Sequence, residues 1–243
     1  MMELSELTAR LHASLEHDPR VNHHLDRIEA QYDGDAVVLA GEVSSLAAKR
    51  LALEAVAAVP GVVGIIDRLH VTPSEAMADG AIADHLQRAL MSDSVFGFFE
   101  VHRSVGGPAD VGRESQPSSG QPYIVIRVED GVVTLDGEVP SLTHKRLAGV
   151  LAWWVPGSRD VINGLGVEPP EQDTDDEILD ALRTVLEKDP LLNATRLSAS
   201  CKDSRIRLGG VVRTAAEKAL AESDAWALFA VDDVVNEIQV LHP

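Results

Sequence analysis

Apolar residues along the chain alternate between two spacings, and this alternation occurs three times. A spacing of three or four residues, which places side chains on one face of a helix, gives way to a spacing of two, which places them on one face of a strand. The helical spacing covers Leu4–Leu15, Ile82–Leu90 and Ile178–Leu186. Each block is therefore predicted to begin with a helix and to continue into a β-hairpin.

The predicted hairpins carry the residues that tight turns require. Asp33-Gly34 and Asp130-Gly131 supply the positive φ angles of such turns in the first two blocks, and Asp203-Ser204 takes their place in the third. Each return strand contains a glycine, which indicates a bulge or the close approach of another backbone segment, and we expect that segment to be the helix packed above. These strand glycines are Gly41, Gly137 and Gly210.

A second helix and a last strand follow each hairpin. The second helices cover about 45–59, 141–155 and 214–229. Pro60-Gly61 and Pro156-Gly157 end the first two of these helices, because proline and glycine interrupt a helix, whereas the third has Ala230 in place of the glycine. The predicted fold class is therefore α+β. It consists of three tandem α-β-β-α-β modules, each with two helices packed on one face of a small mixed three-stranded sheet.

The three blocks align without gaps from the strand glycine onward, which identifies an internal repeat. We predict modules over 1–72, 78–168 and 174–243. The second module holds about twenty extra residues, and the glycines, prolines and serines around 105–121 predict a mobile loop there. Phe98-Phe99 precedes this insertion and indicates a longer or additional strand.

Charge narrows the classes of partner. The chain has 39 acidic and 21 basic residues, a formal net charge of −18. Such a field repels nucleic acid and anionic lipid at long range, so we predict no nucleic-acid partner and disfavour a phospholipid partner. The N-terminal residues lack the basic and apolar regions of a signal peptide, and no stretch is apolar enough to cross a bilayer. A cytoplasmic location is therefore expected.

No set of residues forms a convincing catalytic or metal site, and we predict neither enzymatic activity nor a cofactor. Cys201 is the only cysteine and is interpreted as a small apolar strand residue. His23 and His24 are neighbouring strand residues that point to opposite faces, so at most one of them could join His17 in a common set of metal ligands. The acidic run from Glu171 to Glu177 has two interpretations. It is either an exposed linker with acids at a helix N-terminus, which we favour, or a site for a hard cation.

Aromatic and basic residues provide the candidates for a binding interface. Trp153 and Trp154 end the second helix of the middle module, and adjacent helical positions point about 100° apart. We favour core or inter-module packing for them, with an external partner or lipid contact as the alternative. A lysine recurs at one position in all three modules, where its stem covers the sheet edge or, less favoured, its ammonium binds phosphate. The interface candidates are Trp153, Trp154, Phe98, Phe99, Lys49, Lys145 and Lys218.

These features together resemble the BON family, named for bacterial osmotically inducible and nodulation proteins. The resemblance rests on the Gly-Val-Val-x-Leu-x-Gly-x-Val run from Gly131 to Val139, on the helix with its lysine and paired alanines, and on the segment from Val155 to Val167. It covers nearly the whole chain in three units. The third unit is more divergent, since Ala230 replaces a glycine.

The resemblance implies a non-catalytic module associated with osmotic or envelope stress, with phospholipid surfaces and, in a cytosolic member joined to a LysM domain, with potassium sensing. Our leading hypothesis is a cytosolic binding or scaffold protein that contacts a protein partner or assembles with itself. One alternative is a sensor of potassium, calcium or a small ligand, and another is a module that binds phospholipid surfaces.

Overall fold

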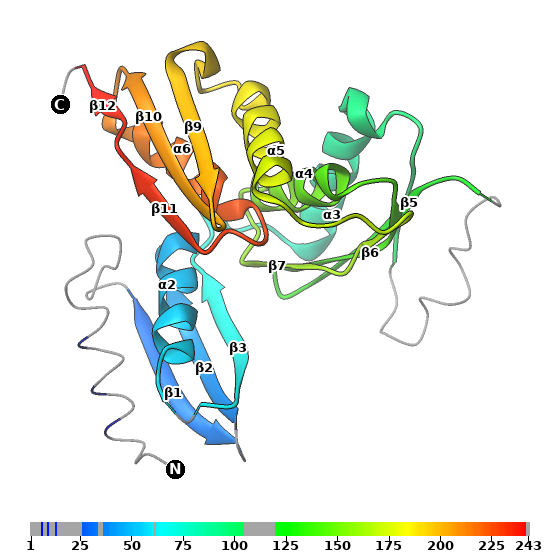
Figure 1. The fold of residues 1–243 in the computed structure, drawn as a ribbon. Helices are drawn as coiled ribbons and strands as arrows, with labels where there is room; N and C mark the ends of the chain where they lie inside the picture. Colours follow the sequence, from blue (N-terminus) through cyan, green and yellow to red (C-terminus); the bar gives the residue numbers. More distant parts are fainter. Residues whose placement is uncertain are drawn as a thin grey trace. The chain divides into compact units, whose positions relative to one another are not determined.

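The computed structural model describes residues 26–33, 36–60, 62–104 and 120–241, together with Glu6, Ala9 and Ala13 (Figure 1). The chain forms two compact units, Met1–Thr72 and Pro73–Pro243. The predicted turn glycines Gly34 and Gly61 and most of the insertion at 105–121 lie outside the described residues. So does the leucine stripe of the first helix, although the three isolated residues described within it are helical.

The first unit is a single module. Its elements are β1 (Arg27–Asp33), β2 (Ala36–Val43), α2 (Leu46–Ala57) and β3 (Gly64–Val71). Strand β2 is central, with β1 antiparallel on one side and β3 parallel on the other. Alternate residues of β2, including Val37 and Leu39, pack against the stripe formed by Ala48, Ala52 and Val56 of α2, and all five are fully buried.

The second unit contains two modules in succession. The first has α3 (Asp79–Ser92), the 3-10 turn η1 (Ser94–Phe96), β4 (Glu100–Arg103), β5 (Tyr123–Glu129), β6 (Val132–Val139), α4 (Leu142–Trp153), β7 (Asp160–Asn163) and β8 (Gly166–Val167). The second has α5 (Asp175–Lys188), η2 (Ala194–Arg196), β9 (Leu197–Lys202), β10 (Arg205–Val212), α6 (Ala215–Ala227), β11 (Asp233–Asn236) and β12 (Gln239–Val240). We call them the middle and the third module.

Both modules repeat the sheet of the first, with two differences. The last strand is divided in two, into β7 and β8 in the middle module and into β11 and β12 in the third. All four segments are parallel to the central strand of their sheet. In the middle module β4 adds a further strand, parallel to β5 at the edge of the sheet. The predicted α+β class is confirmed, the middle and third modules have their elements in the predicted order, and the additional strand of the middle module begins directly after Phe99.

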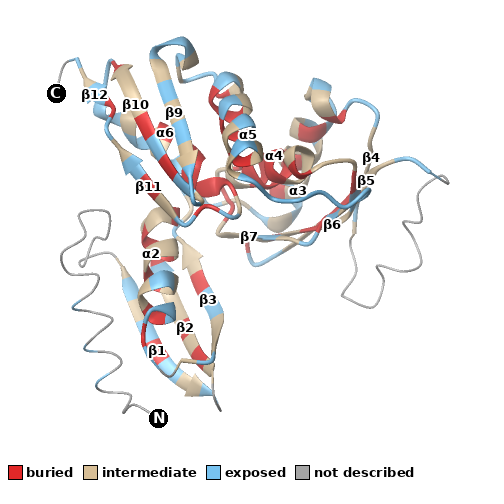
Figure 2. Cartoon of the chain, viewed as in Figure 1, coloured by how far each residue is buried: buried red, intermediate tan, exposed pale blue. Residues whose placement is uncertain are grey.

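Helices of the two modules contact one another across the module boundary, α4 with α5 and α6. Buried positions follow these helices and the strand faces beneath them, and the outer faces of β9 and β10 carry exposed residues (Figure 2). The middle and third modules therefore bury their helical faces together in one compact unit.

The strand glycines have another cause than the helix that we expected. Gly41, Gly137 and Gly210 adopt φ angles of 131°, 130° and 109°. A Cβ atom on each would lie 1.8, 2.2 and 2.1 Å from the carbonyl oxygen of Arg27, Tyr123 and Arg196, respectively. All three oxygens belong to the start of the neighbouring strand or the residue before it. The close approach is therefore made by the hairpin's own first strand, and the expectation of a helix was wrong.

The second helix of each module begins at a hydroxyl side chain that accepts a hydrogen bond from a backbone N–H three residues on. These N-cap residues are Ser45, Ser141 and Thr214, with distances of 3.1, 3.3 and 3.1 Å. In the third module Glu217 also accepts from the N–H of Arg213, the residue before the N-cap, at 2.9 Å. The cap fixes where the chain leaves the hairpin and enters the helix.

Candidate functional site

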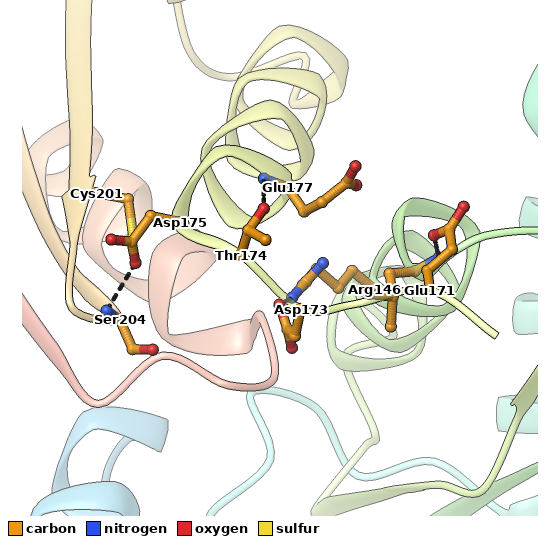
Figure 3. A network of polar contacts seen from close by, with 9 residues as sticks. Arg146, Glu171, Asp173, Thr174, Asp175, Glu177, Cys201 and Ser204 are labelled. Carbon is orange, nitrogen blue, oxygen red and sulfur yellow. Dashed lines mark hydrogen bonds and ion pairs between the residues drawn. The ribbon is translucent and has the colours of Figure 1, made fainter.

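The acidic segment between the middle and third modules is bonded to both of them (Figure 3). On the side of the middle module, Glu171 Oε2 accepts a hydrogen bond from the Leu142 N–H at the start of α4, at 2.7 Å. Two residues on, Asp173 forms an ion pair with Arg146 of α4. These contacts attach the linker to the N-terminal half of α4.

The next residues attach the linker to the third module. Thr174 caps α5 by accepting from the Glu177 N–H at 3.3 Å. The carboxylate of Asp175 accepts from the N–H groups of Asp203 and Ser204, at 2.8 and 2.9 Å, in the β9–β10 turn. These two backbone hydrogen bonds lower the pKa of Asp175 below its ordinary value.

A matching contact exists in the middle module and was missed from the sequence. Asp79 opens α3 as Asp175 opens α5, and it accepts from the N–H groups of Asp130 and Gly131 at 3.0 and 2.9 Å. The sequence feature that could have predicted this contact is the aspartate found at the same helical position in both modules. It joins the N-terminus of the first helix to the hairpin turn.

The acidic run is therefore occupied by protein contacts at three of its carboxylates, Glu171, Asp173 and Asp175. Across the described ranges, no group of three or more histidine, cysteine or acidic side chains is arranged to hold a metal ion. The linker interpretation agrees with these contacts, and cation binding stays a prediction.

Arg146 is the central side chain of this junction. It is 1% exposed, and its guanidinium carbon lies 4.5 Å from the centroid of the Phe229 ring in the third module. A buried guanidinium is stable only when its charge is compensated, here by the Asp173 carboxylate and the face of an aromatic ring. Arg146 therefore connects α4, the linker and the third module.

A second polar contact joins the modules at the other end of α4. The indole Nε1–H of Trp154 donates to Asp224 Oδ1 of α6 at 2.8 Å. Asp224 is 1% exposed, and burial raises its pKa to about 8, with the nearby Asp189 carboxyl as a further cause in the same direction. Lys188 adds an ion pair with Asp93 at 2.8 Å. Trp154 thus lies between the modules, while Trp153 is half-buried at the end of α4.

The recurring lysine has two different environments. Lys49 is 4% exposed; its Nζ donates to the Leu69 carbonyl at 2.6 Å and pairs with Asp67 at 3.0 Å. In the other two modules an asparagine replaces this aspartate, and its side-chain amide donates to the backbone carbonyl of the lysine. These pairs are Asn163 with Lys145 at 2.7 Å and Asn236 with Lys218 at 3.0 Å. The lysine is buried in the first module, where Asp67 provides an acidic partner. Phosphate binding by these lysines stays a prediction.

Phe98 and Phe99 belong to an aromatic cluster at the start of β4. Phe99 stacks on His144 with ring centroids 5.4 Å apart and contacts Phe96 edge to face, while Phe98 is 56% exposed. Burial lowers the pKa of His144, an effect that Glu171 opposes. The cluster is therefore an apolar surface rather than a charged one at neutral pH.

The contacts of Cys201, Gly131, Gly157 and Ala230 are explained by packing and backbone conformation. Burial raises the pKa of the Cys201 thiol to about 11, and its hydrogen bond to Asp175 acts in the same direction. Gly131 occupies the β5–β6 turn with φ 77°, and Gly157 packs against Met77 and Ile82. Ala230 has φ 62°, which strains a residue with a Cβ atom. No helix in the described part of the chain is long and apolar enough to span a membrane.

Comparison with known proteins agrees with the repeat. The BON domain family matches residues 4–73, 114–169 and 174–242. Two solved structures of CdsD, a structural protein of the type III secretion system of Chlamydia trachomatis, cover 99% and 98% of this chain and 100% and 93% of theirs. Both are 14% identical with a TM-score of 0.25, values that support no functional inference. No curated protein gave a significant match. The chain belongs to the BON domain family, of which it carries three tandem copies.

Proposed function

We propose that this chain is a non-catalytic binding and scaffold protein whose modules contact a protein partner or other copies of the chain, in a role linked to osmotic or envelope stress. One observation carries the proposal. The helices of the middle and third modules are buried against each other, whereas the outer face of the third sheet is exposed and, among the described residues, no strand pairs with the outer edge of β9. Surfaces for partners therefore lie on the sheets.

The residues of the junction support this role because they connect modules. Arg146, Asp173, Trp154 and Asp224 make contacts that span the boundary between the middle and third modules. Buried polar groups and the buried Arg146 guanidinium in these positions fix the orientation of one module relative to the next. A fixed pair of modules presents its exposed surfaces at a constant spacing, which suits a scaffold.

Size-exclusion chromatography with light scattering tests self-assembly, and affinity capture from cells before and after osmotic shock tests partner binding. A variant with Ser198→Glu and Ser200→Glu places charge at two exposed positions on the outer face of the third sheet and tests whether this face makes the contact. We expect the wild-type chain to form a defined oligomer or to capture a protein, and we expect the glutamate variant to lose that oligomer or that protein. A monomer over a hundredfold range of concentration that captures nothing specific would overturn the proposal.

The phospholipid alternative has one observation in its favour. The outer face of the third sheet carries exposed Lys202, Arg205 and Arg207, although the chain as a whole is acidic. Arg207 is already paired with Glu237, which reduces the positive charge of this face. Sedimentation with phosphatidylglycerol vesicles separates the alternatives, because a scaffold that acts on proteins stays in the supernatant.

The cation alternative is separated by thermal unfolding in potassium, sodium, calcium and magnesium salts at matched ionic strength. A ligand of the folded state raises the unfolding temperature. A rise with one ion only supports a sensor. An equal rise with all salts reflects screening of acidic self-repulsion, and the scaffold proposal then stands.

A further inference from the structure

The middle module shows how its sheet edge accepts a strand. Strand β4 lies parallel to β5, with Val101 opposite Ile124 and Arg103 opposite Ile126. The pairing is supported by hydrogen bonds from the Glu100 N–H to the Pro122 carbonyl at 3.1 Å and from the Ser104 N–H to the Ile126 carbonyl at 2.9 Å. The backbone of Ile126 therefore points toward β4.

Helix α3 also holds β4 in place. The side-chain amide of Gln87 donates to the Val101 carbonyl at 2.9 Å. Asp84, one turn earlier on the helix, forms an ion pair with Arg103. The strand β4 therefore lies in a groove between α3 and β5 and is bound through its backbone and through one basic side chain.

The third module repeats this groove. Leu197 pairs with Gly210 as Ile124 pairs with Gly137, so Leu197 and Ala199 are the counterparts of the β5 residues that face β4. On α5, Arg183 stands at the position of Gln87 and Asp180 at the position of Asp84. In the described part of the chain, no strand pairs with the free edge of β9.

A hollow marks the position that a strand would occupy. It has a volume of about 250 Å³ and is lined by Arg183, Leu186 and Glu187 of α5 and by Leu197, Ser198 and Ala199 of β9. Its lining combines apolar side chains with a charged rim. Arg183 pairs with Asp180 at 3.2 Å, and both side chains are exposed.

We propose that the groove between α5 and β9 binds an extended segment of a partner protein, which adds to the sheet as a strand parallel to β9. The inference rests on the proposed scaffold function and names its binding surface. The segment carries an aliphatic residue opposite Leu197, as Val101 lies opposite Ile124, and a basic residue two positions later.

Each group that lines the groove has a partner in the proposed bound segment. The Leu197 carbonyl and the N–H and carbonyl groups of Ala199 pair with the backbone of the bound strand, and the aliphatic side chain fills the hollow. The Leu197 N–H already donates to the Ala194 carbonyl. The basic residue pairs with Asp180, which releases Arg183 to donate to a backbone carbonyl as Gln87 does. Glu187 at the rim adds negative charge, which favours a basic segment over an acidic one.

The probe is a synthetic peptide with the sequence of residues 98–104, Phe-Phe-Glu-Val-His-Arg-Ser, because this segment occupies the equivalent groove of the middle module. Hydrogen exchange of the full chain is followed by NMR with and without the peptide. We expect slower exchange of the Ala199 amide and unchanged exchange in β5. A peptide with glutamate in place of its arginine should bind at least tenfold more weakly.

Two variants locate the contact. Asp180→Lys changes an exposed side chain and should weaken binding at least tenfold, whereas Asp232→Lys makes the same charge change outside the groove and should leave it unaltered. Ala199→Pro removes an amide of the open edge and fills part of the hollow, which should abolish binding. Equal affinity for the wild-type chain and Asp180→Lys, or unchanged exchange of the Ala199 amide at saturation, would overturn the proposal.

The failure of this inference and the failure of the scaffold function give different results. A protein that is captured equally by the wild-type chain and by Asp180→Lys leaves the scaffold proposal intact and removes the groove from it. Slower exchange caused by a second copy of the chain, detected with a dimer in light scattering, would also overturn the partner proposal, because the occupant would then be the chain itself.

Discussion

Replacing Asp224 with asparagine tests whether the junction between the middle and third modules contains a protonated carboxyl group. In the folded chain, Oδ1 of Asp224 accepts from the Trp154 indole. Its Oδ2 is buried and has no hydrogen-bond donor among the described residues. The Asp189 carboxyl lies beside it and is also buried, at 5% exposure. Two carboxyl groups can form a hydrogen bond only when one of them carries a proton.

The sign of the pH dependence follows from the direction of the pKa shift. Burial raises the pKa of Asp224 from its ordinary 3.8 to about 8, so the folded chain keeps a proton that the unfolded chain releases above about pH 4. The contribution of this proton to stability is complete below the unfolded pKa and is lost as the pH rises toward 8. The loss is at most about 1.4 kcal/mol per pH unit, the limit for one proton.

Asparagine avoids this loss because it is neutral at every pH. Its oxygen still accepts from Trp154, and its amide donates to Asp189 as the protonated carboxyl does. At pH 7, about three units above the unfolded pKa, the ceiling of the gain is about 4 kcal/mol. We expect Asp224→Asn to be about 2–4 kcal/mol more stable than the wild-type chain at pH 7, and the difference to shrink to about 1 kcal/mol at pH 4.5.

Urea unfolding followed by tryptophan fluorescence between pH 4.5 and 8 provides the measurement, since Trp154 reports on this junction. Asp232→Asn is the control, because it removes an exposed carboxylate and should change stability by less than about 0.5 kcal/mol at each pH. A stability difference between Asp224→Asn and wild type that is constant with pH would refute a protonated Asp224. So would an asparagine variant that is less stable than wild type at pH 7.

Three further substitutions test the reasons given for local structure, each by the change in the free energy of unfolding. Gly137→Ala should cost at least about 2 kcal/mol, because a Cβ atom there meets the Tyr123 carbonyl; a cost below about 1 kcal/mol would contradict the close approach. Ala230→Gly should stabilise the chain by about 0.5–1 kcal/mol by removing strain at φ 62°, and a loss of stability would show that the side chain matters more. Lys49→Met should destabilise by about 1–2 kcal/mol more than Lys145→Met, since the Lys49 ammonium bonds the buried Leu69 carbonyl and Asp67, whereas the Lys145 ammonium lies over the Phe229 ring; equal costs would show that the Lys49 contacts are of no consequence.

The fold could be predicted because its determinants are local and occur three times. The spacing of apolar residues predicted the helices and hairpin strands of the middle and third modules, and the hairpin turns and N-cap residues mark where elements begin. Ser45 and Ser141 each precede a helix by one residue, as capping requires. Agreement between copies makes each local signal more reliable than it would be in a single module.

The site depends instead on pairs of residues that are distant in sequence. Trp154 and Asp224 are separated by 70 residues, and nothing in either segment indicates the other. The sequence did suggest that a tryptophan packs between modules, but not which residue receives its indole N–H. The contacts of Asp79 and Asp175 could have been predicted from the sequence, because an aspartate is the first residue of the first helix in two modules.

The strand glycines were predicted for a sound reason but with the wrong neighbour. A glycine in a strand indicates that something approaches the backbone closely, and sequence alone does not distinguish a helix above the sheet from the adjacent strand. The φ angles near 130° of Gly41 and Gly137 identify the adjacent strand, since this conformation bends the return strand over the start of its partner.

Differences between the copies are more informative about function than their similarities. Positions that keep one residue type in the modules, such as the strand glycines, are explained by the fold of a single module. Positions that differ adapt one module to its neighbours: Asp67 draws Lys49 inward where Asn163 does not, and Phe229 replaces a proline and covers Arg146. The edge of β5 is covered by β4, whereas in the described part of the chain no strand covers the equivalent edge of β9, which is bordered by Arg183 and Asp180. An unpaired edge is a risk for aggregation, and a bound strand at β9 would remove that risk as β4 removes it at β5.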